Sequence, residues 1–289
     1  MTLHEFQFTS ADGLKVACAR WNNRKTGRGV IQIAHGMGEH MGRYQSLIEA
    51  LVRAGLIVYA NDHRGHGKTA RSREEFGHFG PGGFKLLVDD MVRLSEIVKS
   101  ENNGQPLILF GHSMGSFAAQ QYVLDHSRLV DGLALSGSGA LDGLAHISKS
   151  AKSGENYLNA PFAPARTPFD WLSRDPAIAD SFMSDPLCFG SLQRKSMESF
   201  MAASSQLADP CRLYGIRRDL PIYLFSGSDD PVGQQLKGVK VLMERYRHAG
   251  LANICHHFYP GGRHEMLNEI NSNEVQMNLI IWVSCVLNW

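Results

Sequence analysis

The chain alternates short apolar runs with longer segments in which apolar residues recur at helical spacing. The apolar runs lie at residues 30–34, 56–60, 107–110, 132–136, 221–226 and 254–259, and helical spacing occurs at 44–52, 84–98, 116–126, 239–249 and 274–289. Short buried strands joined by helices are typical of a mostly parallel sheet covered by helices on both faces. The alternation therefore predicts an α/β fold. Two earlier runs, 6–8 and 15–20, flank Asp12 and Gly13 and predict a hairpin.

The alternation stops between about residues 139 and 215. This stretch gathers prolines among large apolar residues, which include Phe162, Phe169, Trp171, Phe182, Met183, Phe189, Met197, Phe200 and Met201. A segment this long and apolar is not a loose linker, so we expect an inserted lid of short helices. The predicted organisation is one domain with an insertion: residues 1–138 and 216–289 form the core, and residues 139–215 form the lid.

Composition sets limits on compartment and partners. The 289 residues are 43% hydrophobic and 20% charged with a net charge of +1, which gives no electrostatic reason to expect nucleic acid or anionic membrane as a partner. The five cysteines are widely spaced and form no zinc-ligand pattern, and residues 1–10 lack an apolar signal-peptide core. The apolar stretch at 277–287 is too short to span a bilayer, so we expect a final helix packed on the sheet. These features predict a cytoplasmic protein without a metal site.

A Gly-His-Ser-Met-Gly sequence at residues 111–115 follows the apolar run 107–110 and precedes a segment of helical spacing. A GxSxG sequence alone is common, but at a strand-to-helix junction it forms a sharp turn that presents the serine hydroxyl above the sheet. Ser113 is therefore the first candidate for a catalytic nucleophile.

A serine hydroxyl needs a base to take its proton, and the base needs an acid to orient it. Both types of residue follow later strands. Asp229 and Asp230 come directly after the strand at 221–226, and His264 follows the strand that ends at Tyr259. The carboxyl ends of strands are where an open α/β sheet places its ligand site, and the order Ser, Asp, His is that of α/β-hydrolases. Either aspartate is a candidate at this point.

Five strings resemble the monoacylglycerol lipase and lysophospholipase group of α/β-hydrolases, sometimes placed with the S33-type serine aminopeptidases. They are HGMGEH at 35–40, DHRGHG at 62–67, GHSMG at 111–115, GSDDPV at 227–232 and GRHE at 262–265. The strings span nearly the whole chain outside the predicted lid. The resemblance implies the α/β-hydrolase fold: a mostly parallel eight-stranded sheet flanked by helices, with an inserted helical lid.

By this resemblance Ser113 is the nucleophile, His264 is the general base and later the general acid, and Asp230 is the orienting acid. The family pattern favours Asp230 over Asp229, because the acid stands third after the glycine at the strand end. The resemblance also makes Met37 and Met114 the backbone N–H donors of the oxyanion hole. His35 and His112 lie in the motifs and are expected to tie loops together by hydrogen bonds. No cofactor and no metal ion is implied.

The predicted activity is hydrolysis of carboxylic esters of fatty acids through an acyl-enzyme. The resemblance makes monoacylglycerols the first expected substrates. Lysophospholipase and general carboxylesterase activity stay as alternatives, followed by an aminopeptidase and a non-catalytic binding module. An aminopeptidase needs acidic side chains for a free amino group, and the lid has acids scattered at Glu155, Asp170, Asp175, Asp180 and Asp185. The expected partner is a small lipid or ester molecule, and transient contact of the lid with a membrane or micelle surface stays open, as does the oligomeric state.

Overall fold

An eight-stranded sheet forms the centre of the protein. The computed structural model describes residues 1–23, 27–150 and 156–289. The strands are β1 (Thr2–Thr9), β2 (Lys15–Asn22), β3 (Val30–Ala34), β4 (Ile57–Asn61), β5 (Leu107–His112), β6 (Gly132–Ser136), β7 (Ile222–Gly227) and β8 (Ile254–Tyr259). They lie in the order β1-β2-β4-β3-β5-β6-β7-β8. The predicted hairpin and all six later strands are confirmed.

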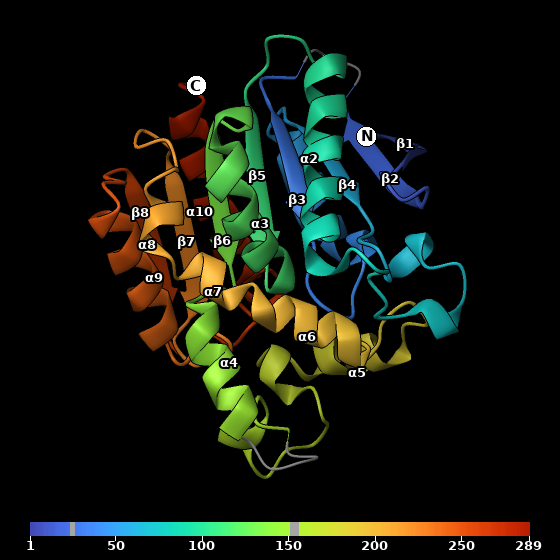
Figure 1. The fold of residues 1–289 in the computed structure, drawn as a ribbon, viewed down its shortest axis with the longest axis vertical. Coiled ribbons are helices and arrows are strands. Elements are labelled where there is room, and N and C mark those ends of the chain that lie inside the picture. The colour runs from blue at the N-terminus through green and yellow to red at the C-terminus, as the bar shows by residue number, and fades with distance from the viewer. Residues whose placement is uncertain (24–26, 151–155) are drawn as a thin grey trace.

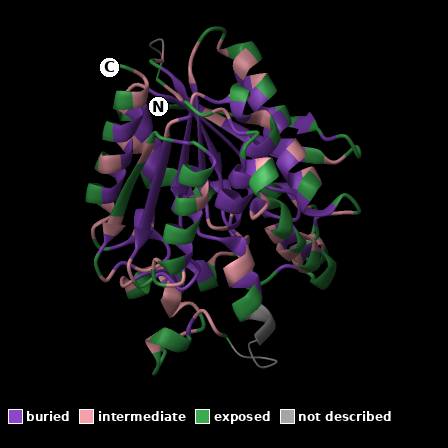
Figure 2. Ribbon diagram, turned by 60° about the vertical axis from the view of Figure 1, so that its left-hand side comes forward, coloured by how far each residue is buried: buried purple, intermediate pink, exposed green. Residues whose placement is uncertain are grey.

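Strand directions follow the expected pattern. β1 pairs antiparallel with β2, and β2 pairs antiparallel with β4, whereas the strands from β4 through β8 pair in parallel. The parallel strands β3 to β7 are buried along their whole length, because helices cover both faces of the sheet (Figure 2). Their carboxyl ends therefore meet at one edge, where the loops that carry the five strings quoted above begin.

Two layers of helices flank the sheet. Helices α1 (Gln45–Arg53) and α10 (Ser272–Val286) cover one face, and α2 (Gly83–Glu101), α3 (Met114–His126) and α9 (Lys237–His248) cover the other. Each layer has its own apolar core against the sheet. Trp282 of α10 stacks on Tyr223 of β7 with ring centroids 5.5 Å apart, which confirms the predicted packing of the C-terminal helix. None of the helices within the described ranges is long and apolar enough to cross a membrane.

The chain between β6 and β7 leaves the sheet and returns only at Ile222. It contains α4 (Leu141–Ser150), α5 (Pro176–Ser184), α6 (Arg194–Ala202), α7 (Ser204–Leu207) and α8 (Pro210–Leu213). Figure 1 shows α4, α5 and α6 beyond the carboxyl ends of β5 and β6. Phe200 of α6 packs against Phe84 of α2 and Phe117 of α3, with ring centroids 5.0 and 5.8 Å apart. The boundaries 139 and 215 stay a prediction. Here this whole segment between β6 and β7 is called the lid segment.

Short 3-10 helices complete the connections. They are η1 (Met41–Tyr44), η2 (Gly67–Thr69), η3 (Arg73–Glu75), η4 (Ser127–Leu129), η5 (Ala160–Phe162), η6 (Asp170–Leu172) and η7 (Met266–Asn268). Three of them carry or adjoin residues of the site described below: η1 follows the loop after β3, η6 belongs to the lid segment, and η7 follows His264.

Candidate active site

Ser113 occupies the sharp turn between β5 and α3. Its backbone has φ 51° and ψ −123°, a conformation that residues with side chains rarely adopt and that costs on the order of 1–3 kcal/mol. Backbone hydrogen bonds hold the turn on both sides. The N–H of Ser113 donates to the carbonyl of Ser136 at 2.9 Å, and the N–H of Ser116 donates to the carbonyl of Ser113 at 2.8 Å. A turn of this kind presents the serine hydroxyl to the space above the sheet.

The two glycines of the GxSxG sequence are required by close packing. A Cβ atom at Gly115 would collide with the carbonyl oxygens of Ala34 and His35, which end β3 and begin the next loop. A Cβ atom at Gly111 would lie 2.5 Å from the carbonyl oxygen of Gly115. The start of α3 can therefore approach β3 only because both positions lack a side chain.

His264 and Asp230 form a buried pair. The Nδ1 atom of His264 lies 2.9 Å from Oδ1 of Asp230, and the two side chains are 2% and 0% exposed. Val232 also donates its N–H to Oδ1 of Asp230 at 2.9 Å. Asp229, by contrast, is exposed and accepts a hydrogen bond from Oγ of Ser228. The structure thus brings Asp230 to the imidazole and leaves Asp229 at the surface, because adjacent residues of the turn after β7 point in different directions.

The surroundings of His264 favour its protonated form. Burial by itself lowers the pKa of His264, but the negative charge of Asp230 and the hydrogen bond to it more than offset burial, so the pKa is raised above 6.5. Since Nδ1 faces Asp230, Nε2 is the atom free to exchange a proton with a nucleophile. A histidine in this arrangement is suited to act as a base and then as an acid.

Met37 and Met114 are the two residues predicted to form an oxyanion hole. Met114 is the first residue of α3, where N–H groups are free of helical partners and the helix dipole favours negative charge. Met37 belongs to the loop after β3, and both residues line the same cavity as Ser113 and His264. The role of their backbone N–H groups as an oxyanion hole stays a prediction.

Arg43 joins two loops of the site, and the sequence-based analysis missed it. Its guanidinium donates to Glu39 at 2.9 Å and to both carboxylate oxygens of Glu265 at 2.6 and 2.9 Å. Glu39 also accepts from the hydroxyl of Tyr44 at 2.6 Å and from the N–H of Gly36. Glu39 and Arg43 are four residues apart and Glu265 directly follows His264. This buried network thus connects the loop of Met37 with the loop of His264.

His35 ties two loops together, as predicted, whereas Nδ1 of His112 lies 3.3 Å from Oγ of Ser136 and links the ends of strands β5 and β6. The Nδ1 atom of His35 lies 2.7 Å from the carbonyl of Gly36, and Nε2 accepts the N–H of His63 at 2.9 Å. Burial lowers the pKa of His35 to about 3 and that of His112 to about 4. Both rings are therefore neutral near pH 7, and the bond from His63 assigns the proton of His35 to Nδ1.

Part of the lid segment pairs with the loop that carries His264. The N–H of Glu265 donates to the carbonyl of Leu172 at 2.7 Å, and the N–H of His264 lies 3.4 Å from the carbonyl of Trp171. The indole of Trp171 lies against the imidazole of His264, with ring centroids 4.8 Å apart. Trp171 thus covers the imidazole of His264 from the side of the lid segment.

A buried carboxylate strengthens this junction. Glu269, whose side chain is 0% exposed, accepts from the N–H and Nε of Arg174 and from the N–H of Arg263. Arg263 in turn places its guanidinium over the ring of Phe162 and donates to the carbonyl of Ser173. The lid segment is therefore anchored beside His264 by charge as well as by backbone hydrogen bonds.

A cavity of about 430 Å³ lies above Ser113 and His264. Apolar side chains from the lid segment and from α3 form most of its wall: Phe117, Leu144, Leu158, Phe169, Trp171, Leu172, Phe182, Phe189, Met197, Phe200 and Met201. Such a wall matches a hydrocarbon chain better than a charged group, because few of its side chains offer hydrogen bonds.

Comparison with known proteins agrees with this geometry. A family model described as "Serine aminopeptidase, S33" matches residues 25–271. The monoacylglycerol lipase of Mycolicibacterium smegmatis is 27% identical over 286 residues, which cover 98% of this chain and 97% of that protein. Human monoglyceride lipase is 27% identical over 288 residues, which cover 95% of this chain and 88% of that protein.

Solved structures share the fold over the full length. A thermostable carboxyl esterase from Bacillus coagulans, crystallised in complex with glycerol, superimposes with a TM-score of 0.88 at 28% identity, and 99% of each chain is covered. The lid segment is thus part of the architecture that the two proteins have in common, since the match leaves almost none of either chain uncovered.

Proposed function

Because the chain belongs to the S33 serine aminopeptidase family of α/β-hydrolases, we propose that it hydrolyses carboxylic esters of fatty acids with Ser113 as the nucleophile. The observation that carries this proposal is the buried pair of Asp230 and His264, whose imidazole lines the same mostly apolar cavity as Ser113. A bound ester would place its carbonyl carbon at Ser113 and its acyl chain along the apolar wall.

The reaction proceeds in two half-reactions. His264 takes the proton of the Ser113 hydroxyl through Nε2 while Oγ attacks the ester carbonyl, and Asp230 stabilises the imidazolium that forms. The N–H groups of Met37 and Met114 hold the negative oxygen of the tetrahedral intermediate. His264 then gives its proton to the departing alcohol, which leaves an acyl-enzyme. Water, activated by the same histidine, releases the fatty acid and restores Ser113.

Monoacylglycerols are the proposed substrates. The cavity wall supports an acyl chain, and the relatives that match nearly the whole chain include the monoacylglycerol lipase of Mycolicibacterium smegmatis and human monoglyceride lipase. Lysophospholipids and simple carboxylic esters stay as the alternatives, since they present the same acyl group with another alcohol.

The acidic residues of the lid segment give no support to an aminopeptidase. Asp175 caps the N-terminus of α5, and Asp170 accepts hydrogen bonds from Thr167. Asp180 pairs with Arg166, and Asp185 lies 2.9 Å from Nε2 of His40. Glu155 lies outside the described residues. Each of the four described carboxylates thus has a partner within the protein.

The proposed location is the cytoplasm. All five cysteines are free thiols, which suits a reducing compartment. A transient contact with a membrane or micelle would use the lid segment, where Met183 is 45% exposed and Ile147 is 37% exposed. These two side chains lie near the cavity helices and would add apolar area to such a contact.

Replacement of Ser113 by Ala tests the activity. Loss of the nucleophile is expected to lower kcat for a nitrophenyl ester by about 10⁶-fold, because the remaining groups act only through it. The wild type is then compared on a monoacylglycerol, a lysophosphatidylcholine and an aminoacyl anilide. Highest kcat/KM on the monoacylglycerol is the expected result. Unchanged turnover in the Ser113→Ala variant, or a preference for the anilide, would contradict the proposal.

A further inference from the structure

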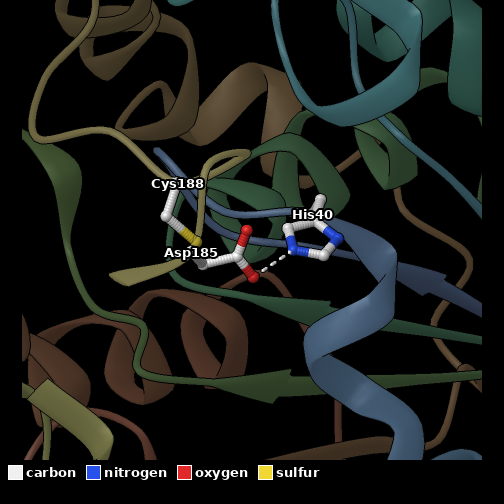
Figure 3. A group of neighbouring side chains, drawn as sticks. All are labelled: His40, Asp185 and Cys188. Carbon is white, nitrogen blue, oxygen red and sulfur yellow. Dashed lines mark hydrogen bonds and ion pairs between the residues drawn. The ribbon is translucent and has the colours of Figure 1, made fainter. Parts of the chain in front are cut away.

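Three side chains that the proposed reaction does not use meet outside the catalytic cavity. They are His40, at the start of η1, and Asp185 and Cys188, from the turn after α5 (Figure 3). One ligand atom of each lies within 4.8 Å of the other two, and Nε2 of His40 is 2.9 Å from Oδ2 of Asp185. The cluster thus links the loop after β3 with the lid segment.

The donor set is that of a zinc site. Imidazole nitrogen, thiolate sulfur and carboxylate oxygen are the three protein ligands that Zn²⁺ takes in tetrahedral sites. With metal–ligand distances of about 2.0–2.3 Å, neighbouring ligand atoms of a tetrahedron lie about 3.2–3.6 Å apart. His40 and Asp185 would separate slightly and Cys188 would move in, so changes of about 1 Å suffice to close the site around the ion.

The cluster is accessible and has a suitable charge. The side chains of His40 and Asp185 are 14% and 28% exposed, so water can reach a fourth coordination position. One carboxylate and one thiolate balance the two charges of the ion. The nearby cation Arg43 does not upset this balance, because Glu39 and Glu265 already pair with it.

Two protons must move when the ion binds. Burial raises the pKa of the Cys188 thiol to about 12, so the metal has to displace the thiol proton. The Nδ1 atom of His40 accepts the N–H of Gly42 at 3.2 Å, which places the imidazole proton on Nε2, facing Asp185. Coordination through Nε2 moves that proton to Nδ1 and gives up the bond from Gly42. One proton is released to solvent and one is transferred within the ring.

We propose that His40, Asp185 and Cys188 bind one divalent cation of the zinc class and that the ion fastens the lid segment to the loop of the oxyanion hole. The same two segments already meet nearby, where the N–H of Phe189 donates to the carbonyl of Gly38 at 2.9 Å. A metal bridge from His40 to Cys188, two residues from Gly38 and one from Phe189, would add a second, stronger link at this point. The inference goes beyond ester hydrolysis and can be tested without an ester.

The test uses Co²⁺ and Zn²⁺ on the full chain with the exposed cysteines Cys211, Cys255 and Cys285 replaced by Ser, so that Cys188 is the accessible thiol that remains. One equivalent of Co²⁺ is expected to produce a sulfur-to-cobalt charge-transfer band, which Zn²⁺ abolishes by displacement. Zn²⁺ at about a hundredfold excess over its Kd is expected to raise Tm by about 5 °C. Because binding displaces the Cys188 thiol proton, the apparent Kd should fall as the pH rises from 6.5 to 8.

Cys188→Ser in that background is expected to remove the band and the rise in Tm, and Asp185→Asn is expected to raise the Kd at least tenfold. Circular dichroism and Tm without metal show whether each variant folds. If Cys188→Ser does not fold, the Kd of Asp185→Asn tests the proposal. A band that persists in Cys188→Ser, or no binding to a folded parent at millimolar Co²⁺, would overturn the proposal. Either outcome leaves the proposed ester hydrolysis untouched, because no ester enters the assay.

Discussion

At the residue scale, the chemistry depends on how His264 is held. Asp230 holds Nδ1 and the indole of Trp171 covers the ring, so the orientation of the imidazole is fixed on two sides. Burial and the charge of Asp230 act on the pKa of His264 in opposite directions, and the charge prevails. The protonation of this one ring therefore depends on one carboxylate.

Asp230→Asn is expected to lower kcat by about 10⁴-fold, because the amide no longer stabilises the imidazolium or the correct tautomer. Catalysis needs the neutral imidazole, so kcat/KM of the wild type falls as the pH drops through the raised pKa of His264, above 6.5. Without the charge of Asp230, burial dominates the pKa of His264 and lowers it. The fall of kcat/KM on the acid side of the pH profile therefore moves to lower pH. The measurement is kcat/KM on a nitrophenyl ester from pH 5 to 9.

The matched control is Asp229→Asn, which changes the neighbouring carboxylate at the surface. This variant should have the same kcat as the wild type and the same fall of kcat/KM at low pH. A large loss in this variant, with an active Asp230→Asn protein, would transfer the role of orienting acid to Asp229.

At the scale of elements, buried ion pairs connect the loops that carry the site. Arg43 of η1 reaches Glu39 in the loop after β3 and Glu265 in the loop before η7. Glu269 similarly joins the His264 loop to Arg174 of the lid segment. Loops that support backbone N–H donors need such fixation, because an oxyanion hole acts only when its donors are already in place.

Arg43→Ala is expected to destabilise the protein by about 3–5 kcal/mol, because it leaves two buried carboxylates without their cation. The side chain of Arg43 is only 9% exposed. Urea unfolding measures the change. Arg53→Ala is the control, since Arg53 pairs with Glu49 at the surface with 71% exposure and its loss should cost about 1 kcal/mol or less. Equal losses in the two variants would show that the network contributes no more than a surface pair.

At the scale of the whole molecule, the cavity results from two parts of the chain that fold together. The sheet edge supplies Ser113 and His264, and the lid segment supplies most of the apolar wall. The aromatic contacts of Phe200 with Phe84 and Phe117 join the lid segment to α2 and α3, so the wall is continuous with the main core. The acyl chain would occupy the space between these two parts.

The rate of ester hydrolysis should therefore rise with acyl-chain length. Each buried CH₂ contributes about 0.8 kcal/mol, which corresponds to about a fourfold gain in kcat/KM for each added methylene. The gain should end when the chain exceeds the cavity of about 430 Å³. A series of nitrophenyl esters from acetate upward measures this dependence. Highest kcat/KM on the acetate would show that the cavity does not hold the acyl chain.

The sequence by itself determined the elements of the fold and the residues proposed for chemistry. Apolar runs predicted the strands, and the signal is most direct for β3 to β7, because parallel strands buried along their whole length need local apolar runs. The string around Ser113 predicted the turn, since Gly111 and Gly115 are needed wherever that turn packs against β3. Both signals lie within a few residues of the feature they predict.

Only the tertiary structure decided which distant side chains meet. It placed Asp230, which the family pattern had already favoured over Asp229, against His264. It also joined Arg43 to Glu265 across 222 positions and placed His40 beside Asp185 across 145 positions. No local period relates such residues, because their separation depends on how the lid segment packs on the sheet edge. The acyl-chain cavity and the proposed metal site both arise from that packing.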